Sequence, residues 1–311
     1  MLWLLATAFA ADDAVCSTWT PSALVTEVDK MPAKEASGLA VIADGFLTHN
    51  DSSGAASLYQ FDLLGNYLRE ITIEGATNTD WEDIAVGACD EGYQGECVFI
   101  ADIGDNDEVR DHVTIWRAPV ADADSYTATA CDLEYEDGEA HDAEALLLFP
   151  DLSVRIVTKT DGKAKVFRSD SLSCDGSVQT LTEETSLDLG EPISGGAVSN
   201  DGLNVALRSN EHGWVWQADC GIDWSATPAD LLFVGEEQGE AMDFADDGSL
   251  YSVSEGKNFE LHQLPCADTR SPVCADCGCS ARPASATASV GAALAAAFAS
   301  LAAGLRRRRA G

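Results

Sequence analysis

The chain has 311 residues, with 18 Lys and Arg against 53 Asp and Glu, so its formal net charge at pH 7 is −35. Hydrophobic residues make up 46% of the chain, which is enough for a sizeable core and argues against wholesale disorder. The charge argues against a nucleic-acid partner, because phosphate contacts need clustered Lys and Arg. The one basic run, residues 306–309, lies at the C-terminus.

Residues 1–10, MLWLLATAFA, form a short apolar run that ends in Ala-Phe-Ala. This ending is typical of a signal-peptide cleavage site. We therefore expect residues 1–10 to be a signal peptide and the protein to be exported. The alternatives are a buried N-terminal strand or a wrongly assigned start site.

Between Pro21 and Cys266, short alternating apolar runs are separated by Gly, Asp and Asn turns, and no long helical period is present. This pattern predicts an all-β fold. Five similar blocks follow one another at intervals of 45, 62, 50 and 46 residues. Their equivalent starting positions are Ser37, Glu82, Glu144, Ser194 and Glu240.

Repeats of this length, with three or four strands each, are typical of propeller blades. The fifth block has only three strands, and residues 23–29 alternate suitably to supply its fourth. We therefore predict that residues 21–266 form a five-bladed β-propeller closed by an N-terminal strand. The interval of 62 residues leaves six blades as the alternative.

The innermost strands of a propeller begin beside its central channel, so the glutamates at the block starts should converge. Converging carboxylates repel one another, and a cation, raised pKa values or pairing with Lys159 and Arg208 would relieve this. The second strand of each block should end beside the same central channel. The predicted metal ligands are Glu82, Glu144, Glu240, Asp102 and Asn50.

Calcium suits such a ligand set because it takes six to eight oxygens, and Mg²⁺ or Mn²⁺ could replace it. The five histidines are scattered, which argues against zinc. The alternative is that Glu82 and Glu144 only lock adjacent blades through hydrogen bonds and salt bridges. Lys159 and Arg208 could take part in either arrangement, or could clamp an anionic ligand.

Residues 102–108 resemble a calcium loop in composition but not in spacing, and we expect them to form a turn-rich loop over one mouth of the channel. Trp81 should pack between blades. No Gly-x-Ser-x-Gly motif or phosphate-binding glycine loop is present, and no catalytic residue is identified.

Ten cysteines indicate an oxidising compartment. Cys89 and Cys97 flank a polar turn between two apolar runs, so we expect them to staple one hairpin. Cys16 and Cys266 bracket the predicted propeller and could tie its ends together. The pairing of Cys131, Cys174 and Cys220 stays open.

The C-terminal region begins with a Cys- and Pro-rich stretch, residues 267–283. An uncharged segment, residues 284–305, follows and is long enough to span a bilayer as a helix of ~33 Å. The Arg run completes a predicted membrane segment over residues 284–311, with the arginines on the cytoplasmic side.

This order of parts resembles the myxobacterial-type C-terminal sorting signal, MYXO-CTERM. The resemblance implies anchoring at the cell surface or outer membrane, with the membrane and a sorting protease as partners and cleavage near Cys279. A plain tail anchor or an Ala-rich surface helix is the alternative.

Several segments of the predicted propeller resemble exported bacterial propellers of the phytase-like family, which is described by an "esterase-like activity of phytase". They are residues 78–85, 100–106, 135–146, 156–159, 239–241 and 253–256. The resemblance implies a propeller fold and makes a metal-assisted phosphoester hydrolase conceivable.

Two functions therefore remain. The first is a surface-anchored binding or structural module whose acidic channel holds a divalent cation and meets a surface or small-molecule ligand. The alternative is a secreted, metal-dependent phosphoesterase or esterase, in which the metal activates water while Lys159 and Arg208 hold the anion. We favour the binding module, because no complete catalytic set can be identified.

Overall fold

The computed structural model describes residues 14–28, 31–33, 35–52, 54–90, 95–219, 221–236, 238–254 and 259–272. These residues form strands, turns and loops and contain no helix, so none of them could cross a membrane as a long apolar helix. They all belong to one compact unit that ends at Val273. The predicted signal peptide, Cys279 and the predicted membrane segment lie outside the described residues.

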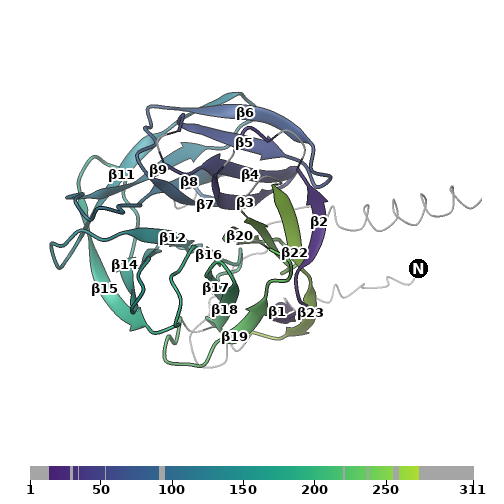
Figure 1. Cartoon of the computed structure of the whole chain (residues 1–311). Coiled ribbons are helices and arrows are strands. Elements are labelled where there is room, and N and C mark those ends of the chain that lie inside the picture. Colours follow the sequence, from purple (N-terminus) through teal and green to yellow (C-terminus); the bar gives the residue numbers. More distant parts are fainter. Residues whose placement is uncertain are drawn as a thin grey trace, which may run out of the picture. The chain divides into compact units, whose positions relative to one another are not determined.

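Five inner strands form a closed ring, in which each neighbours the next and the last neighbours the first (Figure 1). The inner strands are β3 (Ala36–Ile42), β7 (Trp81–Ala88), β12 (Ala143–Leu148), β16 (Gly195–Val198) and β20 (Gly239–Phe244). The strands that follow each of them pair outward, antiparallel. The prediction of an all-β propeller is confirmed, and we call each inner strand with its outer partners a blade.

The blades differ in how their outer strands are completed. In the first blade, β3 is followed by β4 (Gly45–Asn50), β5 (Ser57–Phe61) and β6 (Tyr67–Glu74), with the short β10 (Ser125–Thr127) parallel to β6. In the second blade, β7 is followed by β8 (Glu96–Asp102), β9 (Val113–Pro119) and β11 (Thr129–Tyr135). The long interval between the second and third blocks therefore contains the loop after β8 and the two strands β10 and β11.

The third blade contains β12, β13 (Val154–Thr158), β14 (Ala164–Ser169) and β15 (Gln179–Leu187). Its outer strand β15 pairs in parallel with β11, which joins the second and third blades into one eight-stranded sheet. The fourth blade contains β16, β17 (Asn204–Arg208), β18 (His212–Gln217) and β19 (Ala229–Leu232).

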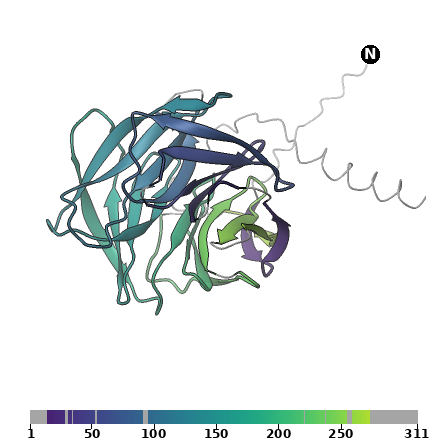
Figure 2. The ribbon, with the colours of Figure 1, turned by 45° about the horizontal axis from the view of Figure 1, so that its top comes forward.

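The fifth blade is closed by the N-terminal part of the chain, as predicted. Strands β20, β21 (Leu250–Ser254) and β22 (Glu260–Leu264) are followed outward by β2 (Ala23–Glu27), which pairs antiparallel with β22. Figure 2 shows the purple β2 beside the yellow-green strands of this blade from a second angle. Next to this closure, β1 (Val15–Trp19) and β23 (Cys266–Arg270) form a two-stranded ribbon.

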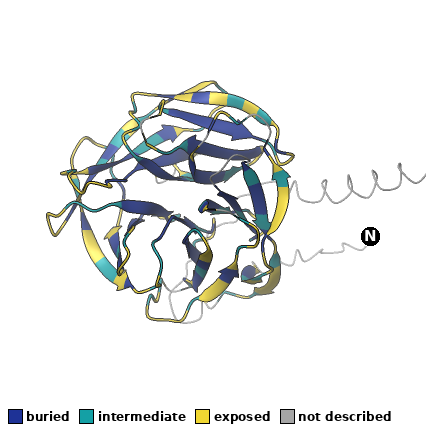
Figure 3. Ribbon diagram, in the orientation of Figure 1, coloured by how far each residue is buried: buried dark blue, intermediate teal, exposed yellow. Residues whose placement is uncertain are grey.

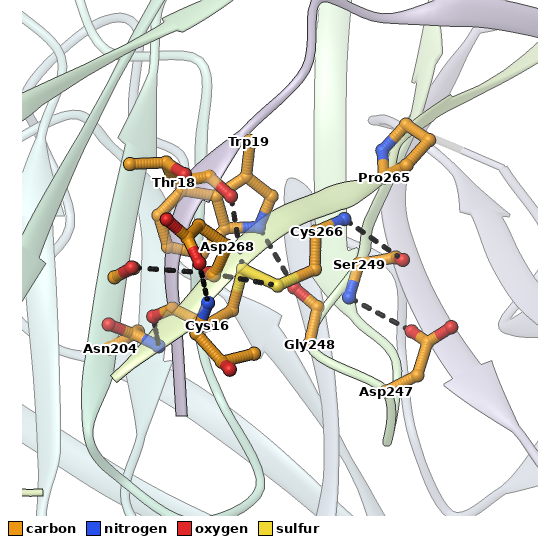
Figure 4. Close-up of a disulfide and its surroundings, with 12 residues drawn as sticks. Cys16, Thr18, Trp19, Asn204, Asp247, Gly248, Ser249, Pro265, Cys266 and Asp268 are labelled. Carbon is orange, nitrogen blue, oxygen red and sulfur yellow. Dashed lines mark hydrogen bonds between the residues drawn. A yellow bond between two sulfur atoms is a disulfide. The ribbon is translucent and has the colours of Figure 1, made fainter. Parts of the chain in front are cut away.

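Three disulfides support this arrangement. Cys16 and Cys266 join β1 to β23 across 250 residues of sequence, and the Trp19 indole beside them donates a hydrogen bond to the Gly248 carbonyl at 2.8 Å (Figure 4). The predicted Cys89–Cys97 bridge is present in the second blade. The third bridge joins Cys131 to Cys174.

The core lies between the blades, because the middle strands are buried on both faces while the outer strands alternate (Figure 3). Trp81 is fully buried between the first two blades, against apolar residues such as Leu47 and Ile71, and this confirms its predicted packing role. Its indole N–H donates to the Thr77 carbonyl at 2.9 Å, so the burial leaves no unpaired donor.

Candidate functional site

Bulges at the block starts set the direction of the key glutamates. Strand pairing shifts by one residue at Glu82 in β7, at Glu144 in β12 and at Glu240 in β20. In β3 the shift falls between Ala36 and Leu39. A bulged residue leaves the regular alternation of the strand and its side chain is re-aimed.

Five carboxylates meet where β7 and β12 begin. Their oxygen atoms form two groups, each with all members within 4.8 Å of one another, and Glu82 belongs to both. We call the five residues of these two groups the carboxylate cluster: Asp51, Asp80, Glu82, Asp142 and Glu144. Asp80 and Asp142 directly precede β7 and β12, and Asp51 directly follows β4.

Burial and mutual repulsion disfavour the ionised forms of these acids. Glu82 and Glu144 are only 3% and 2% exposed. Burial raises the pKa of Glu82 well above its usual range, and the neighbouring Glu144, Asp51 and Asp80 raise it further. Burial likewise raises the pKa of Glu144 to about 7 and, together with Asp51 and Asp142, that of Asp80 to about 6. A cation placed among these oxygens would favour the charged forms instead.

One lysine partly compensates the cluster. Lys159 directly follows β13, and its Nζ lies 2.5 Å from Glu144 Oε1. Burial alone would lower the pKa of Lys159, but attraction to Glu144 and Glu82 raises it above its ordinary value. The ammonium therefore stays charged and offsets one of the five carboxylates.

The loop after β8 packs directly against the cluster. A Cβ on Gly104 would lie 2.2 Å from Glu82 Oε1 and 2.6 Å from Asp80 Oδ2, so only glycine fits there. The Gly104 carbonyl accepts a hydrogen bond from Arg110 Nη1 at 2.8 Å, and the Asp105 N–H donates to Asp142 Oδ1 at 2.8 Å. The loop that the sequence predicted over one mouth of the ring thus contacts three of the five carboxylates.

Two of the predicted metal ligands, Glu82 and Glu144, lie in the cluster, whereas Asp102 and Glu240 are not members of its two groups. Asp102 accepts hydrogen bonds from the Asp80 N–H at 3.1 Å and from Arg110 Nη1 at 2.9 Å, so it positions the Asp80 backbone.

Asn50 and Glu240 have other contacts. The Asn50 carbonyl accepts a hydrogen bond from Asn78 Nδ2 at 3.1 Å, and Asn78 also donates to the Asp51 carbonyl at 2.8 Å. Glu240 Oε1 accepts one from Asn210 Nδ2 at 2.8 Å.

Three members of the cluster, Asp51, Asp80 and Asp142, were not among the predicted ligands. A signal existed for two of them, because Asp80 and Asp142 each stand two residues before a bulged glutamate. The equivalent position before Glu240 is Gln238. The fifth blade therefore lacks the aspartate that accompanies the glutamate in the second and third.

Arg208 is the last residue of β17, and Lys159 directly follows β13, so the two occupy similar positions in their blades. The surroundings of the two side chains differ. The Arg208 guanidinium is completely buried, donates to Glu236 Oε2 at 3.1 Å and lies 4.0 Å from the centre of the Phe233 ring. A Cβ on Gly239 would lie 1.5 Å from Arg208 Nη2, so the backbone packs tightly against it. Arg208 and Lys159 thus pair with different carboxylates, and Arg208 has no exposed surface to offer an anion.

No protein-family model matches the chain, and no curated protein matches it. Among solved structures, the PQQ-bound aldose sugar dehydrogenase of Streptomyces coelicolor is 11% identical, with a TM-score of 0.46 over 78% of this chain and 97% of that one. The apo-form of the soluble aldose sugar dehydrogenase of Escherichia coli is 8% identical, with a TM-score of 0.47 over 80% of this chain and 100% of that one. At such identities the similarity concerns the fold alone.

Proposed function

We propose that the carboxylate cluster binds a divalent cation and that the propeller acts as an exported binding or structural module at the cell surface. The observation that carries the proposal is the convergence of five carboxylates from three blades, with Glu82 shared by both groups. The three disulfides fit an oxidising compartment outside the cytoplasm.

The chemistry of the ligand set favours calcium. All five side chains offer oxygen, and neither histidine nor cysteine belongs to the two groups. Calcium takes six to eight oxygens in flexible geometry, and backbone carbonyls or water could complete its shell. Mg²⁺ or Mn²⁺ would use fewer of the same oxygens.

The charge of the cluster favours a binding module over a phosphoesterase. With all five acids ionised, one lysine leaves a net charge of −4, and one divalent cation reduces this to −2. A phosphoester would approach an anionic site, and the second predicted anion ligand, Arg208, is completely buried. A ligand that is neutral or cationic fits this field better.

The test compares melting of the full chain in Ca²⁺ and in chelator, together with metal analysis. We expect bound metal and a higher Tm in Ca²⁺, because an ion that binds only the folded state stabilises it. Glu82→Gln should abolish the Ca²⁺-dependent shift, whereas the exposed Glu211→Gln should retain it. Absence of both bound metal and the shift in the unaltered chain would refute the proposal.

The same variant separates a cation site from a purely structural role. In chelator at pH 8, Glu82→Gln should be at least as stable as the unaltered chain, because it removes a buried carboxyl whose ionisation is unfavourable. Ser37 Oγ, 3.2 Å from Glu82 Oε2, can still donate to the amide oxygen. If Glu82 only locked the blades together, the substitution would lower the Tm in chelator.

A further inference from the structure

The Lys159 ammonium, which is a cation of the protein itself, lies against the carboxylate cluster. Lys159 touches the segment that contains Asp142 and Glu144 in two ways. Its backbone N–H donates to the Asp142 carbonyl at 2.9 Å, and its Nζ lies 2.5 Å from Glu144 Oε1. The backbone contact fixes where the side chain begins, so the ammonium is tethered beside the proposed ligands.

The two partners of this ion pair differ in their freedom to move. The Glu144 side chain is 3% exposed and lies in an inner strand, whereas the Lys159 side chain is 41% exposed. Lysine has a flexible four-carbon stem, and its ammonium is strongly hydrated. The carboxylate is therefore held in place, and the ammonium can turn outward into water without disturbing the core.

A divalent ion coordinated by Glu144 would come close to this ammonium. Calcium–oxygen distances are about 2.3–2.6 Å, similar to the present distance between Lys159 Nζ and Glu144 Oε1. Two cations on one carboxylate repel each other at such short distances. The ammonium belongs to a flexible side chain, so it can move away from the carboxylate into water while the divalent ion stays bound.

We propose that Lys159 is a built-in competitor of the divalent cation, whose ammonium lies against Glu144 and moves into solvent when the ion binds. This inference rests on the proposed function, since it concerns the same cluster. It assigns Lys159 a regulatory role, which is to weaken the affinity and so set the cation concentration at which the site fills.

The first part of the test is calorimetric titration of the full chain with CaCl₂. Lys159→Gln should bind Ca²⁺ at least about tenfold more tightly than the unaltered chain, because the ion then no longer has to displace a positive charge from Glu144. Lys165→Gln is the matched control. Its Nζ lies 2.8 Å from Asp137 Oδ2, outside the cluster, so its affinity should match that of the unaltered chain.

The second part measures displacement directly, by labelling lysine amines with acetic anhydride and counting modified peptides by mass spectrometry. The reactivity of Lys159 should rise when Ca²⁺ is added, because its ammonium leaves Glu144. Lys165 serves as the internal reference. Its side chain is 34% exposed and also salt-bridged, and its reactivity should not change.

The outcomes separate the two proposals. If neither the unaltered chain nor Lys159→Gln binds Ca²⁺, the cation site itself is wrong. If Ca²⁺ binds but Lys159→Gln gains no affinity, or Lys159 labelling stays constant, the site stands and the competitor role is overturned. Tighter binding together with increased labelling supports the inference.

Discussion

Gly104 approaches Glu82 so closely that a Cβ on residue 104 would lie 2.2 Å from Glu82 Oε1. The loop after β8 and the inner strand β7 are therefore fitted to each other at the carboxylate cluster. The contact is between backbone and a buried carboxylate, neither of which can move aside easily. Residue 104 should thus control the geometry of the cluster without taking part in it chemically.

We predict that Gly104→Ala weakens Ca²⁺ binding by at least about tenfold, because the added methyl must displace Glu82 or Asp80. Gly162→Ala is the matched control, since a Cβ there meets only Thr160 Oγ1, at 3.6 Å. Calorimetric titration of the two variants is the measurement. Equal affinities would show that the loop does not shape the cation site.

Asp243 joins the fifth blade to the first, because its Oδ2 accepts the Val41 N–H at 2.7 Å. Burial raises the pKa of Asp243 to about 7. Since the folded state raises this pKa above the unfolded value near 4, its contribution to stability is complete below pH 4 and is lost as pH rises through 7. The loss amounts to about 4 kcal/mol, from roughly three pKa units.

Asp243→Asn should therefore reduce the fall in the free energy of unfolding between pH 5 and pH 8, and the raised pKa values of Glu82, Glu144 and Asp80 should account for the fall that stays. Urea titrations at the two pH values give the comparison. Asp122→Asn, at a fully exposed side chain, should keep the full pH dependence of the unaltered chain. An unchanged pH dependence in Asp243→Asn would mean that the carboxyl ionises freely in the folded protein.

The buried pair of Arg208 and Glu236 should be structural. We expect Arg208→Met to lower the free energy of unfolding by about 3–5 kcal/mol, because it removes the arginine that pairs with the buried Glu236 carboxylate and leaves that carboxylate only the hydrogen bond from Ser252 and the more distant His262. The double variant Arg208→Met with Glu236→Gln should recover a large part of this loss. Denaturant titration measures both, and Ca²⁺ affinity should stay the same in the double variant, whereas a loss of affinity would place Arg208 in the site.

The disulfide between Cys16 and Cys266 should stabilise the fold more than the one between Cys89 and Cys97. The first closes a loop of 250 residues and the second a loop of eight. In the chain-entropy model, their removal should cost about 5.5 and about 2.5 kcal/mol respectively. Paired Cys→Ser variants, compared by denaturant titration, check this order, and the reverse order would show that loop closure in the unfolded chain does not decide the two contributions.

The sequence allowed the fold to be predicted because each blade repeats the same short pattern. The block starts at Glu82 and Glu144 correspond to inner strands, and residues 23–29 contain the strand that closes the fifth blade. Positions that repeat along the chain must converge in a ring, and this is why two cluster members and Lys159 could be named in advance.

The remaining features depend on contacts between distant segments. Cys131 and Cys174 meet because β11 pairs in parallel with β15, which no local pattern discloses. Arg208 resembles Lys159 in its place along the chain, but Phe233 and Gly239 bury it. The Asn78 side chain donates a hydrogen bond to the Asp51 carbonyl and so fixes the backbone of Asp51 beside the cluster. The role of Asp51 therefore depends on a contact between the end of β4 and the segment before β7.

The most direct test of the cation site is a crystal structure of the protein grown with Mn²⁺, with anomalous diffraction data collected to locate the metal. We expect an anomalous peak bonded to Glu82 and to at least two other members of the cluster, with Lys159 Nζ no longer against Glu144. A peak elsewhere, or no peak at saturating Mn²⁺ with Lys159 still paired to Glu144, would show that the carboxylate cluster is not a cation site.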